Sequence, residues 1–218
     1  MAKINLGILD SFIGKVGNVV GSFWKGKAVM RGYTRSVHNP HTDAQEAVRK
    51  RFVAISKLSS ALRGALLAGL GDYAREQQVT ECNSFVRLNF GAVTVDGSGV
   101  VSINYSALET AKGPLPKATF GQADFSTSQR VTVPFEGNSQ SNGARGNDDI
   151  YLLVYSPDID AAVLSTPARR SATEVVCEVP AGWTGLTVHV WGFATGAQGT
   201  AQQKQSSDSA YIGTGEIE

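Results

Sequence analysis

Near the N-terminus, valines and aromatic residues are interspersed with glycines and lysines. Between Gly14 and Thr34 this mixture is typical of short strands separated by turns. It predicts a hairpin with strands Val19–Trp24 and Ala28–Thr34, in which Lys25-Gly26 supplies a turn that needs positive φ. Isolated hairpins are marginal in water. We therefore expect this one to pack either against the rest of its own chain or against another molecule.

The next stretch has the 3.6-residue period of a helix. Thr42 and Gln45 form a Thr-x-x-Gln capping box, which predicts a helix start. Gly69 and Gly71 are expected to end or bend this long amphipathic helix, because glycine is a poor helix former, and to leave Asp72–Gln77 as a short continuation. The apolar stripe of the helix consists of Val48, Phe52, Ile55, Leu58 or Leu62, Leu66, Leu70 and Tyr73.

After residue 80 the period changes to 2, which indicates strands. Turn signals such as Asp96-Gly-Ser-Gly99 and Pro180-Ala-Gly182 separate them. So many short strands in one segment predict an immunoglobulin-like β-sandwich. The predicted strands are Phe85–Asn89, Gly99–Tyr105, Lys117–Phe125, Arg130–Phe135, Ile150–Tyr155, Ala161–Leu164, Glu174–Val179, Leu186–Phe193 and Ser209–Gly213.

The predicted fold class is therefore mainly β with one long α-helix. We expect two domains: a basic, glycine-rich hairpin and helix module in residues 1–78, and the sandwich in residues 79–218. Two segments, Tyr151–Tyr155 and Thr187–Phe193, carry apolar residues at odd and even positions alike. Because such strands are covered on both faces, we expect them in the middle of a sheet.

Charge separates the two predicted domains. Residues 1–78 hold 12 Lys and Arg against 5 Asp and Glu, whereas residues 79–218 hold 8 against 14. The formal net charge of +1 therefore combines a module of +7 with a sandwich of −6. Such a dipole favours contacts between unlike parts of neighbouring molecules.

The sequence offers little catalytic chemistry. It has three histidines and no nucleophile elbow or phosphate loop, so we expect no enzyme, no cofactor and no metal. His38, His41 and Asp43 could supply metal ligands, but we favour a solvated turn for them. Asp158 and Asp160 lack the rest of a calcium-loop pattern.

The remaining features bear on the compartment. Cys82 and Cys177 lie far apart, and without a secretory signal we expect reduced thiols, although the sequence leaves a pairing open. Residues 1–10 lack the apolar core of a signal peptide. No window approaches the ~18 apolar residues of a membrane span, so we expect a soluble protein.

Cations and aromatic residues of the first module form a candidate interface. Basic residues with interleaved aromatic rings could contact nucleic-acid phosphates and bases. We favour a solvated helix face or a protein interface over nucleic-acid binding, because the acidic sandwich would repel a polyanion. The candidate assembly residues are Phe23, Trp24, Lys25, Lys27, Arg31, Arg35, Arg49, Arg51 and Lys57.

Two motifs carry a family resemblance. Gly14-Lys-Val-Gly-Asn-Val-Val-Gly-Ser-Phe-Trp-Lys-Gly26 and Asn39-Pro-His-Thr-Asp-Ala-Gln45, the latter followed by Arg49 and Phe52, resemble an uncharacterised family of roughly 200-residue proteins from Bacteroidetes and their bacteriophages. The second motif is similar to one that recurs in phage structural proteins. The resemblance implies a virion component with an immunoglobulin-like domain, and it implies no catalytic or ligand residue.

Together these features lead us to expect a structural assembly protein of a bacteriophage virion, either a capsid decoration protein or a ring component of the tail or neck. Its partners would be other virion proteins and its own copies, and it would occupy the host cytoplasm during assembly. Two alternatives stay open: a nucleic-acid-binding or packaging-associated protein that uses the basic helix, and a bacterial surface adhesin whose sandwich loops bind glycan.

Overall fold

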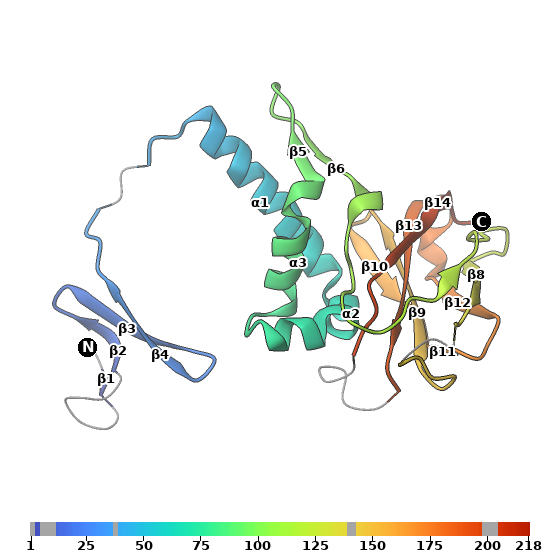
Figure 1. Cartoon of the computed structure of the whole chain (residues 1–218). Coiled ribbons are helices and arrows are strands. Elements are labelled where there is room, and N and C mark those ends of the chain that lie inside the picture. The colour runs from blue at the N-terminus through green and yellow to red at the C-terminus, as the bar shows by residue number, and fades with distance from the viewer. Residues whose placement is uncertain (1–2, 5–11, 37–38, 139–142, 198–204) are drawn as a thin grey trace. The chain divides into compact units, whose positions relative to one another are not determined.

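The computed structural model describes residues 3–4, 12–36, 39–138, 143–197 and 205–218 (Figure 1). Contacts within the chain divide it into two compact units, Met1–Asp43 and Ala44–Glu218. This division falls earlier than the boundary expected after residue 78. It assigns nearly the whole helical segment to the same unit as the C-terminal strands.

The N-terminal unit contains one antiparallel sheet in the order β1-β2-β3-β4. The predicted hairpin is confirmed: β3 has the expected bounds, and Lys25 and Gly26 form the turn with φ of 45° and 77°. Two further strands, β1 and β2, were not predicted. The bounds are β1 Lys3–Ile4, β2 Phe12–Val16, β3 Val19–Trp24 and β4 Lys27–Gly32.

The C-terminal unit begins with three helices, so the prediction of one long helix is wrong. Helix α1 (Asp43–Ala61) starts directly after Thr42, as expected, but the chain then bends by 98° into α2 (Arg63–Glu76). Leu62 lies at the bend and is fully buried. Because of the bend, Leu58 of α1 and Leu66 of α2 reach the same hydrophobic core. Packing, which the helical period does not encode, decides where the helix breaks.

The two glycines expected to bend the helix lie inside α2 instead. A Cβ atom at Gly69 would come within 2.6 Å of the Thr110 carbonyl oxygen and 2.8 Å of the Ala111 Cβ. The Gly69 carbonyl also accepts a hydrogen bond from the Lys112 amide. Gly69 therefore allows a loop to pass close to the helix.

The third helix, α3 (Glu81–Asn89), replaces the strand predicted at Phe85–Asn89, so that prediction is wrong. Thr80 caps the helix: its side-chain oxygen accepts a hydrogen bond from the Asn83 amide. Glu81 in the first turn also suits the helix dipole. The short apolar run around Phe85 fits either a strand or a helix, and the cap decides for the helix.

The rest of this unit is mostly β. Strands β5 and β6 form a hairpin, β7, β8 and β12 form a three-stranded sheet, and β9 to β11 with β13 and β14 form a five-stranded sheet. The bounds are β5 Val93–Val95, β6 Val101–Ile103, β7 Thr119–Phe120, β8 Arg130–Glu136, β9 Asp149–Ser156, β10 Ala161–Leu164, β11 Ala168–Arg169, β12 Glu174–Glu178, β13 Thr187–Thr195 and β14 Ala210–Glu216.

The five-stranded sheet lies between the three-stranded sheet on one side and the helices on the other. Its order is β10-β9-β13-β14, with β11 beside β9, so β9 and β13 are central as predicted. Val188 and Val190 of β13 share one core with β8 and β12, whereas Trp191 and Phe193 share the other core with the helices. The alternation of the strand thus places side chains in two cores.

Candidate assembly interface

The sheet β1–β4 has two chemically different faces. Cross-strand partners point to the same face, and the register pairs Gly14 with Gly21, Gly21 with Met30 and Phe23 with Ala28. We define the apolar face as Phe12, Gly14, Val16, Val19, Gly21, Phe23, Ala28, Met30 and Gly32. We define the basic face as Ile13, Lys15, Val20, Ser22, Trp24, Lys27, Val29 and Arg31.

The apolar face carries no charged side chain, yet it is largely open to solvent. Met30 is 70% exposed, Val16 52% and Phe23 42%. Gly21 is the one buried residue within 12–36, because the Phe12 ring lies over it. Within the described residues of this unit no second layer covers the face. A sheet with one layer cannot bury the apolar side chains that stabilise it.

The basic face combines cations with aromatic rings. The Lys15 ammonium lies 3.4 Å from the centre of the Tyr33 ring, a cation–π contact. Trp24 is half exposed and lies next to Lys27 on the neighbouring strand. Arg31 is the cross-strand neighbour of Val20. This face can contact an anionic surface, whereas the opposite face can bind only apolar groups.

A second exposed apolar surface lies on the first half of α1. Val48 and Phe52 are one turn apart on the same side of the helix, and with the adjoining Val53 they are 50% to 64% exposed. We call these three residues the helix stripe. The buried residues of α1 begin only at Ile55. The predicted apolar stripe is therefore real, but its first half is not covered within the described part of this unit.

Basic residues in the same half of α1 contact other parts of the C-terminal unit. The Arg51 guanidinium donates to the Phe90 carbonyl at 2.7 Å and lies over the Phe90 ring. The Lys50 ammonium donates to the Gly99 carbonyl at 3.1 Å. These contacts fix the exposed half of α1 against η1 (Phe90–Ala92) and the β5–β6 hairpin.

The structure separates the nine predicted interface residues into groups. Phe23 lies on the apolar face, Lys25 in the turn, and Trp24, Lys27 and Arg31 on the basic face. Arg35 follows β4. The other three belong to the second unit, where Lys57 pairs with Asp160 at 3.0 Å. Arg49 and Arg51 also lie on α1, in its first half.

Sequence reasoning missed the most exposed apolar residues. Met30 and Val53, exposed by 70% and 64%, were not among the predicted interface residues. The signal was present, because Gly14, Gly21 and Gly32 share a face with large apolar residues and with no charge. Strand register was needed to sort the residues by face.

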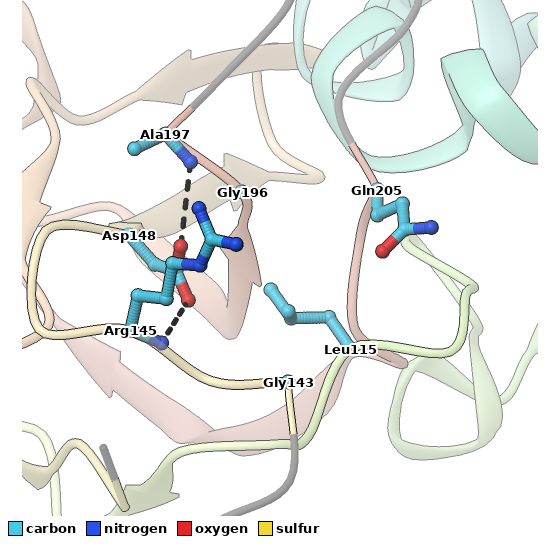
Figure 2. Close-up of a pocket in the computed structure, with 7 residues that line it drawn as sticks. All are labelled: Leu115, Gly143, Arg145, Asp148, Gly196, Ala197 and Gln205. Atoms are coloured by element: carbon cyan, nitrogen blue, oxygen red, sulfur yellow. Dashed lines mark hydrogen bonds between the residues drawn. The ribbon is translucent and has the colours of Figure 1, made fainter.

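The C-terminal unit also contains an open pocket of about 400 Å³ (Figure 2). Its acid, Asp148, is 2% exposed and accepts hydrogen bonds from the backbone amides of Arg145 at 2.8 Å and Ala197 at 3.4 Å. The Arg170 guanidinium also pairs with it at 3.4 Å. All these partners stabilise the carboxylate and hold Asp148 in place within the fold. The pocket is lined by Leu115, Gly143, Arg145, Asp148, Gly196, Ala197 and Gln205.

Other candidate chemistry remains dispersed. His, Cys, Asp and Glu side chains in the described residues form no group of three that could hold a metal ion, and His38 lies outside those residues. Cys82 and Cys177 are free thiols. Among the described helices, none is by itself long and apolar enough to span a membrane, and α1 and α2 meet that measure only when joined across their bend.

One comparison with known proteins gives a match. The model of a family of unknown function (DUF6266) matches residues 11–213, which include β2 to β4, all three helices and most strands of the C-terminal unit. No curated protein matches the chain. The match therefore covers both candidate surfaces and assigns them no activity.

Proposed function

The chain belongs to the DUF6266 family, and we propose that it is a structural assembly protein that acts through contacts with copies of itself and with other proteins. The single-layer sheet β1–β4 carries this proposal. Large apolar side chains on an uncovered sheet face mark a protein interaction site. The basic opposite face adds a second surface to the same sheet, which a particle component in contact with several neighbours requires.

The particle that we propose is a bacteriophage virion, in which the chain is a capsid decoration protein or a ring component of the tail or neck. This part rests on the resemblance of Gly14–Gly26 and Asn39–Gln45 to an uncharacterised family from Bacteroidetes and their bacteriophages. It rests further on the similarity of the second motif to one that recurs in phage structural proteins. The host cytoplasm would be the place of assembly.

We also propose that the two packed sheets are a form of the immunoglobulin-like sandwich. If β7, β8, β9, β10, β12, β13 and β14 are taken as strands A, B, C, C′, E, F and G, the two sheets have the orders E-B-A and C′-C-F-G. That order supports the assignment. The helices on the outer face of the second sheet are an addition to it.

The assembly proposal is tested by measuring the mass of the purified full chain. Mass photometry and analytical ultracentrifugation across nanomolar to tens of micromolar concentrations should show species larger than one chain. Negative-stain microscopy should then show whether they are closed rings. A strict monomer at tens of micromolar that also fails to bind phage particles would contradict the proposal.

The basic face supports a second candidate, a protein that binds single-stranded nucleic acid. Trp24 is exposed for stacking, and Lys15, Lys27 and Arg31 share its face. The sheet is a better candidate than the helix, since Arg51 and Lys57 of α1 are engaged within the molecule. Filter binding of oligonucleotides at 50 to 300 mM salt tests this. Binding that weakens steeply with salt and is lost in Arg31→Glu would favour this candidate.

A further inference from the structure

We propose that the apolar face of the β1–β4 sheet binds the helix stripe of a second copy of the chain. This inference rests on the proposed assembly function and names the two surfaces that meet. Each surface is uncovered within its own unit, and each is the kind of layer that the other lacks. A helix packed on a sheet is one of the few stable two-layer arrangements.

The shape of the apolar face suits a helix. Gly14 and Gly32 lie beside larger residues such as Val16 and Val19, whereas the Phe12 ring fills the space over Gly21, so the face alternates between low and high positions. Low positions allow a helix backbone to approach closely, and the large residues pack beside its side chains. The six-residue strands β3 and β4 are ~20 Å long. The exposed half of α1, Asp43–Ala54, has a similar length of ~18 Å.

The charges favour this pairing over contact between two sheets. Residues 1–43 hold six Lys and Arg against two Asp and Glu, whereas residues 44–218 hold 14 against 17. Two sheets would therefore repel each other, and a sheet is attracted to the C-terminal unit of another copy. The side chains of the apolar face and of the helix stripe are themselves uncharged, so their own burial desolvates no ion. Arg49 projects from α1 between Phe52 and Val53, and its charged end has to stay in water at the edge of the contact.

A contact between two different surfaces has a consequence for assembly. Every copy offers one sheet and one helix stripe, so each bound copy leaves a free surface at both ends of the complex. Copies joined by such a contact therefore keep adding until the assembly closes into a ring, or they form an open filament.

Two lysine substitutions test the inference. Met30→Lys places a charge on the apolar face, and Phe52→Lys places one on the helix stripe. Both positions are more than half exposed, so the fold should tolerate the change. We expect each variant alone to dissociate about tenfold or more readily than the natural chain, since one charge in an apolar contact costs at least 1.4 kcal/mol. When mixed, the two variants should form a dimer that grows no further, because each retains the surface that the other has lost.

Matched controls carry the same charge elsewhere. Val100→Lys and Ile159→Lys change exposed apolar residues of the C-terminal unit that lie outside the proposed contact surfaces. Both controls should assemble like the natural chain, and circular dichroism should show all four variants folded.

The outcomes separate this inference from the assembly proposal. A natural chain that assembles while Met30→Lys or Phe52→Lys assembles equally well overturns the inference and leaves the assembly proposal in place. Loss of assembly in both variants without a dimer in the mixture also overturns it, because the two surfaces then do not bind each other. A natural chain that stays monomeric overturns both.

Discussion

One residue, Arg170, connects three loops of the C-terminal unit. Its side chain is fully buried and pairs with Asp148 at 3.4 Å. It also donates hydrogen bonds to the carbonyls of Gly137 and Pro116. Such a charge is tolerated in the interior because carbonyls and a carboxylate satisfy its donors.

Replacement of this arginine should therefore destabilise the fold. We expect Arg170→Ala to lower the free energy of unfolding by about 3–5 kcal/mol, because Asp148 would stay buried without its cation. Urea unfolding followed by circular dichroism measures the change. Arg130→Ala is the control: its pair with Glu178 is exposed, and its loss should change the unfolding free energy by less than about 1 kcal/mol. Equal effects would contradict this account.

A second residue, His189, gives the fold a pH dependence. Its ring stacks on Tyr105 at 4.1 Å between centroids, and its Nδ1 lies 2.9 Å from the Tyr211 hydroxyl. Burial lowers the pKa of His189, because the charged imidazolium would lose its hydration. The unfolded chain therefore takes up this proton at a higher pH than the folded chain does.

The sign of the effect follows from proton linkage. The contribution of neutral His189 to stability should be complete above the unfolded pKa of about 6.5, and should be lost as the pH falls from there through the lower folded pKa. We expect His189→Gln to show a smaller loss of unfolding free energy between pH 7 and pH 5 than the natural chain. Urea unfolding at several pH values measures both. Identical pH profiles would show that His189 is not buried as a neutral ring.

Among the elements, α2 contains a glycine, Gly69, at an interior position where helix propensity favours alanine. Alanine is about 1 kcal/mol better than glycine in a helix interior. At Gly69, however, the new methyl group would collide with Thr110 and Ala111. We expect Gly69→Ala to lower the free energy of unfolding by about 1–3 kcal/mol.

The same helix contains a matched control. A methyl group added at Gly64 would meet no atom within 4 Å beyond its own stretch of helix, so Gly64→Ala should raise the free energy of unfolding by about 0.5–1 kcal/mol. In thermal unfolding, the midpoint temperatures of the two variants should shift in opposite directions from that of the natural chain. Stabilisation by Gly69→Ala would show that the loop at Thr110 moves away at little cost.

In the whole molecule, the two units should differ in their ability to fold alone. Both hydrophobic cores consist of residues from Ile55 onward, all within the C-terminal unit. We expect a chain that begins at Asn39, and so keeps Thr42 before α1, to fold cooperatively and to stay monomeric. Chemical denaturation and ultracentrifugation measure these properties. A shortened chain that still assembles would show that the sheet β1–β4 is dispensable for assembly.

Local sequence patterns were sufficient to predict several elements of this protein. The hairpin that begins at Val19 follows from its glycine turn, and the start of α1 follows from Thr42. The central position of β9 and β13 follows from apolar residues on both faces of each strand. Each of these is a property of neighbouring residues, so the period and turn chemistry are sufficient. The candidate hairpin residues, such as Phe23 and Trp24, were found in the same way.

Other features of the fold and of the candidate surfaces depend on tertiary contacts. The bend at Leu62 and the role of Gly69 depend on contacts with residues distant in the chain, which no local pattern encodes. The helix at Phe85 was misassigned because a short apolar run fits two periods. The uncharged face of the β1–β4 sheet and the uncovered half of α1 became visible only when register and burial sorted exposed from covered side chains. Burial is a property of the whole packed chain, and it decides which apolar residues remain available to a partner.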